Sequence, residues 1–248
     1  MMKRLQLSGT TLKCIAIAAM TIDHIAYLFV ESSTAVYFIM RMFGRLTAPI
    51  MAFLLVEGFL HTRNFRNYLL RMLAFAFIAE PIYLLMILGR PPMSLWETIQ
   101  NLDVLFTLSI SLVMLWILSQ ERWNMTVRLI VALPCFMLAD LCDWSYILSV
   151  WVMIFFLFRE EKQKRALVFA SASLILLPVK FLSGYESFTA FLFNYGVLLA
   201  LLPIGCYTGE RGGSDTPIVR FCARWGFYLY YPLHMAALVA VKFLIPES

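Results

Sequence analysis

Apolar residues occupy long runs of the chain, and short polar stretches separate these runs. The runs cover residues 12–30, 35–60, 67–88, 102–119, 126–142, 144–158, 166–182, 188–204 and 224–244. A helix needs about 20 mostly apolar residues to cross a hydrocarbon core of ~30 Å, and most runs have roughly that length, 144–158 being short and 35–60 long. The pattern therefore predicts an all-α fold, a polytopic membrane helix bundle of about nine transmembrane helices.

Positive charges are distributed unevenly between the two ends of these predicted helices. With the N-terminus in the cytoplasm, fifteen Lys and Arg residues face the cytoplasm and three face outward, and cytoplasmic loops normally carry such an excess. The fifteen are Lys3, Arg4, Lys13, Arg63, Arg66, Arg71, Arg122, Arg128, Arg159, Lys162, Lys164, Arg165, Arg211, Arg220 and Arg224, and the three are Arg90, Lys180 and Lys242. We therefore expect a cytoplasmic N-terminus and a multi-pass protein of a bacterial-type cytoplasmic (inner) membrane.

The composition agrees with a membrane protein. Of 248 residues, 62% are hydrophobic and 14% are charged, with a mean hydropathy of +0.80, whereas a soluble domain is about one quarter charged. The positive residues cluster in loops, so the net charge of +5 predicts membrane orientation and no nucleic-acid partner. Five scattered cysteines without a CxxC pair predict neither a disulfide framework nor a metal site. Short loops indicate a single transmembrane domain over residues 1–248.

The first predicted helix carries Asp23 and His24 at a depth where lipid should surround it. Ionisable groups there are costly and mark a functional site by default. Lys13 lies eleven residues before His24, which returns it to within roughly 20° of the same helix face and about 16 Å away along the axis. The apolar run continues past these residues without a cleavage pattern, so we expect a retained helix rather than a signal peptide.

The second predicted helix contains two arginines. Arg41 and Arg45 lie four residues apart and share a face, Gly44 permits close approach of a neighbouring backbone, and Pro49 predicts a kink or break just beyond them. Exposure of the four intramembrane ionic groups to lipid would cost ~10–14 kcal/mol, so we expect these groups to face one another or water; they are Asp23, Arg41, Arg45 and Glu80.

The later helices add further polar residues. Asp103 begins the fourth helix, and His234 lies near the middle of the last, two residues after Pro232. His234 is either a hydrogen-bonded core histidine or a functional residue, and the two arginines are either links between helices or part of a site. We expect solvated loop carboxylates at Asp140 and Asp143, and an interfacial role for Glu57 and His61.

Histidine suits general-base chemistry because its pKa lies near neutral pH. Adjacent helix positions point about 100° apart, so Asp23 is poorly aimed at the ring of His24. We expect Asp23 to pair with Arg41 or Arg45, and His24 to be oriented by a group on another helix. Lys13 and the basic cytoplasmic loops suit an anionic donor from the cytoplasm, such as a phosphorylated cofactor.

Several motifs, in this order, resemble the TraX family, within the broader superfamily of integral-membrane acyltransferases. The matching stretches are LKCIAIAAMTIDHI, RMFGRLTAPIMAFLLVEGF, DVLFTLSISL, the DW pair at residues 143–144 with the LFR that follows it, and FYLYYPLHM. The resemblance covers nearly the whole chain. The sequence departs from the family pattern at Ser145 and Ser149, where glycines are expected, and at Asp103, where asparagine is commoner, which bears on the acceptor more than on the reaction class.

The resemblance implies a transfer of an acyl group, usually acetyl, from cytoplasmic acetyl-CoA to an acceptor at or beyond the membrane. Lys13 and His24 match the superfamily's basic residue and catalytic histidine, Arg41 and Arg45 match the family's second-helix arginines, and His234 matches the terminal proline-leucine-histidine. The family's namesake is associated with acetylation of the N-terminus of conjugative pilin.

Our leading hypothesis is therefore an acetyl-CoA-dependent O- or N-acetyltransferase. The residues assigned to catalysis are His24, Asp23, Arg41, Arg45 and His234, and those assigned to donor binding are Lys13, Arg41, Arg45, Glu80 and Asp103. The expected partners are acetyl-CoA, a pilin or cell-envelope glycan acceptor, and the lipid bilayer, and a homo-oligomer is compatible with the sequence.

Two other classes of protein remain open. A proton-coupled transporter also uses intramembrane His, Asp and Glu residues, although the chain shows no inverted repeat of the kind many transporters have. A structural subunit of a secretion or conjugation assembly would use the same polar residues only as links between helices.

Overall fold

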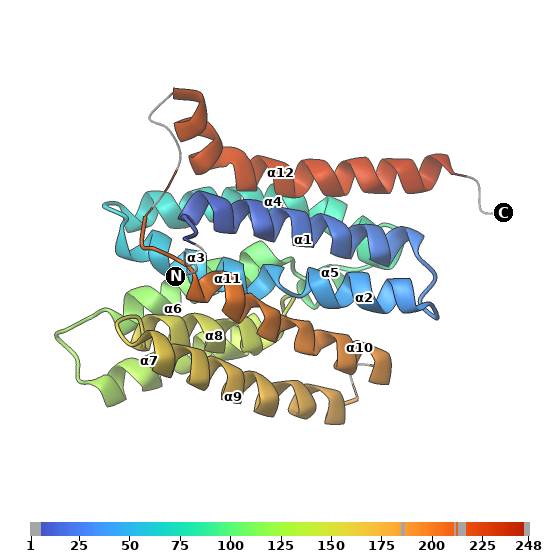
Figure 1. The fold of residues 1–248 in the computed structure, drawn as a ribbon. Coiled ribbons are helices and arrows are strands. Elements are labelled where there is room, and N and C mark those ends of the chain that lie inside the picture. Colours follow the sequence, from blue (N-terminus) through green and yellow to red (C-terminus); the bar gives the residue numbers. More distant parts are fainter. Residues whose placement is uncertain (1–5, 185–186, 211, 213–216, 246–248) are drawn as a thin grey trace, which may run out of the picture.

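The computed structural model describes residues 6–184, 187–210, 212 and 217–245, and for residues 217–224 it describes the backbone alone. All named elements in these ranges are helices that run side by side (Figure 1). They are α1 (Gly9–Phe29), α2 (Ala35–Gly44), α3 (Thr47–Leu60), α4 (Phe65–Leu88), α5 (Leu95–Ile99), α6 (Val104–Leu118), α7 (Met125–Ala139), α8 (Ser145–Leu157), α9 (Lys162–Leu182), α10 (Phe188–Asn194), η1 (Tyr195–Ala200), α11 (Leu201–Gly205) and α12 (Pro217–Leu244). The expected all-α fold is confirmed.

Six stretches of the described chain are long and apolar enough to cross a membrane. They are Gly9–Phe29, Ala35–Leu60, Phe65–Leu88, Lys162–Leu182, Phe188–Gly205 and Trp225–Leu244. Three further apolar helices, α6, α7 and α8, have only 13 to 15 residues, which spans about 20–23 Å. The chain is thus a multi-pass membrane protein, while nine crossings and a cytoplasmic N-terminus stay predictions. Some of the charges used to predict that orientation lie outside the described residues. They are Lys3, Arg4 and Arg211 and the side chains of Arg220 and Arg224.

The helix break that we expected near Pro49 is present in the second apolar run. Helix α2 ends at Gly44 and α3 begins at Thr47, because the proline ring has no N–H to donate to the carbonyl four residues earlier, that of Arg45. Gly44 lies directly against α1: a Cβ atom there would be 2.3 Å from both Cβ and Oδ1 of Asp23. The glycine therefore brings the arginine-bearing helix into contact with Asp23.

Other parts of the chain depart from simple helical spans. The eighth run contains a 3₁₀ stretch, η1, between α10 and α11. There Gly196 packs on α2, and a Cβ would lie 2.0 Å from the carbonyl oxygen of Met42. The polar loop 89–100 contains the short helix α5, and α12 begins at Pro217, seven residues before the predicted run. The 3₁₀ stretch and α5 depend on packing and capping contacts, to which hydropathy is insensitive.

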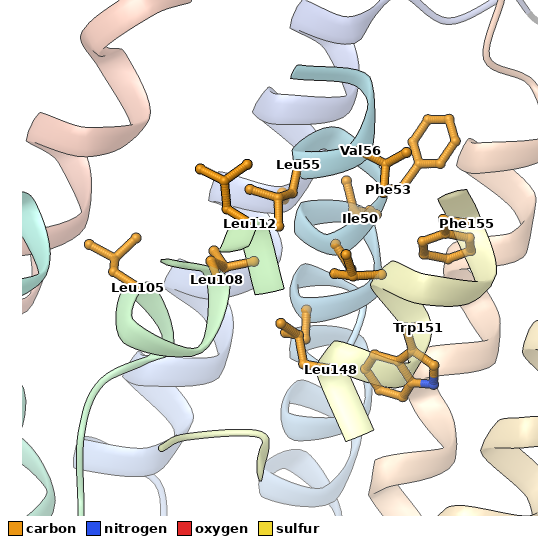
Figure 2. Packing of buried hydrophobic residues seen from close by; sticks show 14 of the residues in the cluster. Ile50, Phe53, Leu55, Val56, Leu105, Leu108, Leu112, Leu148, Trp151 and Phe155 are labelled. Carbon is orange, nitrogen blue, oxygen red and sulfur yellow. The ribbon is translucent and has the colours of Figure 1, made fainter. Parts of the chain in front are cut away.

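The apolar core lies where α3, α6 and α8 meet. Figure 2 shows Ile50 and Phe53 of α3, Leu108 of α6, and Trp151 and Phe155 of α8 converging. Phe53 and Phe155 meet edge to face, with ring centroids 5.7 Å apart, a favourable geometry for aromatic pairs. This core fixes one wall of the site.

The first and last helices pack against each other along the opposite wall, as Figure 1 shows for α1 and α12. The hydroxyl of Thr21 donates to the carbonyl of Ile17, so the hydroxyl of Tyr230, 2.7 Å from the oxygen of Thr21, is the donor in their shared bond. Residues far apart in sequence are thus held side by side in the membrane region.

Candidate functional site

Two arginines of the α2 region clamp one carboxylate of α1. Nη1 of Arg41 lies 2.6 Å from Oδ2 of Asp23, and Nη2 of Arg45 lies 2.8 Å from both carboxylate oxygens. The expectation that Asp23 pairs with an arginine rather than with His24 is confirmed, with both arginines taking part. Such charge-assisted bonds fix geometry as well as contributing energy.

Aromatic rings enclose the same two guanidinium groups. Arg41 lies 5.1 Å from the ring centroid of Phe193 and 5.4 Å from that of Tyr27, and Arg45 lies 5.1 Å from the ring of Trp144. The Nε atoms of both arginines are buried without a hydrogen-bond partner. The cluster therefore carries donors that its own protein bonds do not use.

His24 is oriented by a residue of the last helix. Its Nδ1 lies 2.8 Å from Nε2 of His234, and Nδ1 of His234 lies 2.9 Å from the backbone carbonyl of Tyr230. The ring planes are within 5° of parallel and their centroids are 5.0 Å apart. The nitrogen–nitrogen line spans most of that separation, so the rings meet edge to edge. The expectation that another helix orients His24 is confirmed.

The carbonyl of Tyr230 sets the tautomers of both rings. A carbonyl oxygen only accepts hydrogen bonds, so Nδ1 of His234 carries a proton and its Nε2, in the neutral ring, accepts one. Nδ1 of His24 is then the donor between the rings, which leaves Nε2 of His24 with a lone pair. An imidazole held in one tautomer with a free lone pair can take a proton from a group beside it.

His24 lines a small cavity of about 160 Å³, which we call the His24 cavity. Asp23, Arg41 and Arg45 also line it, as do Tyr83, Asp143 and Trp144. The prediction of a solvated loop carboxylate holds for Asp140, which is exposed, but is wrong for Asp143.

Trp144 and Ser145 have positive φ angles of 63° and 53°, an uncommon backbone for residues other than glycine and one that clusters at functional sites.

A second, larger cavity of about 470 Å³ contains Lys13 and is called the Lys13 cavity. His61 and Arg71 also line it, together with Tyr68 and Tyr228. The guanidinium of Arg71 lies 5.3 to 5.5 Å from the rings of Tyr68, Tyr228 and Trp225, and its Nε is buried without a partner. From the sequence, Arg71 served only to predict the orientation of the chain in the membrane. Its position among aromatic rings becomes apparent only in the folded structure.

Glu57 belongs to the same cavity and is tied to the segment after α11. The hydroxyl of Tyr207 donates to Oε2 of Glu57 at 2.9 Å. Burial, and then this hydrogen bond, raise the pKa of Tyr207, so the phenol remains a donor at neutral pH. Glu57 and His61, for which we expected an interfacial role, both line the Lys13 cavity.

A third cavity of about 480 Å³ lies against the C-terminal part of α12 and is called the Lys242 cavity. Its lining includes Tyr27, Ser32 and Tyr37 of the α1–α2 region and Lys242. Among the described residues that line this cavity, Lys242 is the one with a charged side chain.

The three cavities share walls and lie in series. Met51, Leu108 and Phe227 line both the Lys13 cavity and the His24 cavity. Tyr27, Met86 and Ile87 line both the His24 cavity and the Lys242 cavity. The His24 cavity therefore adjoins both larger cavities, and the residues that it shares with them are apolar or aromatic.

Glu80 and Asp103 form a separate buried pair. Oε2 of Glu80 accepts the backbone N–H of Asp103 at 2.9 Å, and Oδ1 of Asp103 caps α6 by accepting from the N–H groups of Leu105 and Phe106. Neither carboxyl group lines any of the three cavities. The structure brings the five residues assigned to catalysis together, and leaves these two, assigned to donor binding, outside.

Comparison with known proteins covers nearly the whole chain. A family model described as TraX protein matches residues 8–242. A probable fimbrial assembly protein FimC, serogroup H1, of Dichelobacter nodosus is 33% identical over 250 residues, covering 99% of this chain and 100% of that protein. No solved structure matches. With a family match over most of its length and a relative similar from end to end, the chain belongs to the TraX family.

Proposed function

We propose that this protein is a membrane-embedded acetyltransferase that moves an acetyl group from cytoplasmic acetyl-CoA to an amine or hydroxyl acceptor, with His24 as general base. The observation that carries the proposal is the fixed tautomer of His24, whose Nδ1 is bonded to His234 while Nε2 is left for the His24 cavity. The resemblance to integral-membrane acyltransferases supports the same role for this histidine.

The Lys13 cavity suits the donor. Its volume of about 470 Å³ falls within the usual range for small-molecule sites, ~300–1,000 Å³. Lys13 and Arg71 offer cationic groups to phosphates, and Tyr68 and Tyr228 offer rings to a base. We place this cavity at the cytoplasmic side of nine crossings, in keeping with the excess of Lys and Arg in the loops on that side.

The His24 cavity suits the transfer itself. The acceptor's nucleophilic atom gives its proton to Nε2 of His24 as it attacks the acetyl carbon, the C–S bond breaks, and the proton passes to the sulfur of CoA. Arg41 and Arg45 lie in the same cavity, where fixed positive groups stabilise the negative charge that develops on the carbonyl oxygen. The relative's name concerns fimbrial assembly, which supports a pilin or cell-envelope glycan as the source of the acceptor.

The test is acetyl transfer from labelled acetyl-CoA by protein in proteoliposomes supplied with an envelope extract as acceptor. His24→Ala is expected to lose about 10²–10⁴-fold in rate, while Arg90→Gln, a change in a partly exposed ion pair outside the apolar helices, keeps wild-type activity. Full activity of a correctly folded His24→Ala protein would refute the role of this residue.

His234 acts through His24 and is a positioning residue. His234→Ala is expected to lower kcat with little effect on the KM for acetyl-CoA, because the donor is held in a different cavity. A purely structural role predicts instead that activity falls in step with the amount of folded protein.

A proton-coupled transporter is the second candidate, favoured by the three cavities in series. It predicts a solute flux that follows an imposed proton gradient and no binding of acetyl-CoA. Measuring both in the same proteoliposomes separates the two functions.

A further inference from the structure

We propose that the Lys242 cavity binds the head group of an anionic phospholipid, with the lipid phosphate against the ammonium group of Lys242. This inference goes beyond the proposed function and does not depend on it. Three observations carry it: the depth of the cavity in the membrane, the unused hydrogen-bond donors in its wall, and the apolar side chains around it.

The Lys242 cavity lies at the level where several membrane spans end. Its walls include residues from the C-terminal ends of α1, α4 and α12 and from the first turn of α2. The C-terminal ends of α1 and α12 lie at the same end of the bundle (Figure 1). The hydrocarbon core gives way to the head-group region where membrane spans end, so the phosphates of bilayer lipids lie at the depth of this cavity.

Three polar side chains in the wall have donors to offer. They are the ammonium group of Lys242 and the hydroxyls of Ser32 and Tyr37. Among the described residues, no hydrogen bond or ion pair engages these three groups. Ammonium and hydroxyl groups donate to phosphate oxygens, and the described residues of this wall include no carboxylate that would compete for them. The wall therefore favours an anion.

Apolar side chains accompany these donors. Ile87 and Leu88 line the same cavity, and the two residues that follow Lys242, Phe243 and Leu244, are 63% and 80% exposed. In a multi-pass membrane protein, such side chains near the end of a span contact lipid, while a lysine between them extends its ammonium group toward the head groups. A ligand with an anionic head and an apolar tail matches both features, whereas inorganic phosphate matches only the first.

The loop after α4 supports the same depth. Gly89, its first residue, lines the cavity, and the short helix α5 in this loop exposes Leu95 and Trp96. The ion pair between Arg90 and Glu97 closes the turn that presents them. Trp is enriched at membrane–water interfaces, so an exposed Trp on a closed turn next to the cavity is typical of a segment in the head-group region.

Charge selects among the bilayer lipids. The head group of phosphatidylglycerol carries one negative charge, whereas that of phosphatidylethanolamine adds an ammonium group to the phosphate. Lys242 repels that ammonium group, and no carboxylate among the described residues of the wall receives it. Basic pockets between transmembrane helices bind anionic head groups, and each Lys or Arg near the membrane surface adds about fivefold in affinity. The preferred ligand is therefore an anionic phospholipid.

Native mass spectrometry of the purified full-length protein measures this binding. The protein in detergent is titrated with phosphatidylglycerol, with phosphatidylethanolamine of the same acyl chains, or with inorganic phosphate. We expect the first phosphatidylglycerol to bind about fivefold more tightly than the first phosphatidylethanolamine. Equal binding of the two lipids overturns the preference for an anionic head group. Inorganic phosphate that displaces phosphatidylglycerol identifies a site for a free anion and overturns the lipid.

Two matched lysines test the role of Lys242. Lys180 and Lys242 each lie in the last turn of their helix, α9 and α12, but Lys180 lines none of the three cavities. Lys242→Gln is expected to weaken phosphatidylglycerol binding about fivefold and to remove the preference over phosphatidylethanolamine. Lys242→Arg retains the preference, and Lys180→Gln changes binding by less than about twofold. Equal losses in the two glutamine variants indicate a general attraction of surface charge and overturn the site.

A second matched pair tests the cavity itself. Ser32 lines it, whereas the hydroxyl of the neighbouring Ser33 donates to the carboxylate of Glu31. Ser32→Trp is expected to weaken phosphatidylglycerol binding about tenfold through loss of space, and Ser33→Trp to leave it unchanged. Unaltered binding by Ser32→Trp, or an equal loss in both variants, overturns the placement of the lipid in this cavity.

Discussion

The Asp23 cluster and the Glu80–Asp103 pair both place carboxyl groups among apolar helices, yet they are built differently. In the first, two arginines hold one carboxylate at the wall of a cavity. In the second, the carboxyl oxygens accept backbone N–H groups at the start of α6, away from the three cavities. An ionisable residue in a membrane segment thus marks either a site or a helix junction, and its partners show which.

Removal of the shared carboxylate should have the largest effect on stability. Asp23→Ala leaves Arg41 and Arg45 as buried, unpaired charges, and breaking a buried pair costs about 3–5 kcal/mol. We expect a large drop in the thermal midpoint in detergent, with little change for the exposed control Glu121→Ala. If the two variants unfold at the same temperature, the arginines are compensated by something other than Asp23.

The close approach of α1 and α2 provides the next test. A methyl group at Gly44 would overlap Asp23, whereas nothing lies within 4 Å of a Cβ built at Gly205. Gly44→Ala is therefore expected to cost about 1–3 kcal/mol through overpacking, and Gly205→Ala almost nothing. A neutral Gly44→Ala in the same unfolding assay would show that the cluster tolerates separation of its helices.

The Glu80–Asp103 pair should respond to shape rather than to charge. Glu80→Gln keeps an oxygen for the N–H of Asp103 and is expected to change stability by less than about 1 kcal/mol, whereas Glu80→Ala leaves that buried N–H unsatisfied, at about 1–3 kcal/mol. Equal destabilisation by both substitutions would place this pair with the Asp23 cluster, as a site where the charge itself matters.

An ion pair outside the apolar helices gives the smallest effect and sets the baseline. The guanidinium of Arg90 lies 2.6 Å from a carboxylate oxygen of Glu97, and this hydrogen bond lowers the pKa of Glu97. The contribution to stability is thus fully present above the ordinary glutamate pKa of about 4.3 and is lost as pH falls through the lower pKa of the folded state.

Comparison of wild type with Arg90→Gln across that pH range measures the contribution. Exposed pairs contribute little, so the difference in thermal midpoint should be small at pH 7 and vanish in acid. A large difference in thermal midpoint at pH 7 would mean that the Arg90–Glu97 pair also contributes strongly to stability. Burial would then not explain a larger contribution from the Asp23 cluster.

The sequence predicts the parts of this molecule that depend on local chemistry. Hydropathy located the helices, Pro49 located the break between α2 and α3, and helix geometry assigned Asp23 to the arginines rather than to His24. The particular partners of residues on distant helices were not predictable, although a partner for His24 on another helix was expected. His24 and His234 are separated by 210 positions, and Asp143 and Arg71 look like a loop carboxylate and a topology charge until neighbouring helices enclose them.

The helix boundaries that hydropathy did not predict have a common cause. The 3₁₀ stretch η1 accommodates Gly196 against the carbonyl of Met42, and helix α5 is capped by the hydroxyl of Ser94, which accepts from the N–H of Glu97. Both depend on individual packing and capping contacts, which a hydropathy average does not contain. Cavity walls shared by three helices are likewise a property of the assembled bundle.

The pairing of the first helix with the last has a consequence for biosynthesis. Ribosomes add about 5–20 residues per second, so roughly 10–40 s separate the synthesis of His24 from that of His234. During that interval α1 carries its polar residues into the bilayer without the ring that orients His24. Nascent and truncated chains consequently lack the His24–His234 contact, and the chemistry that we propose for His24 requires α12 to be docked on α1.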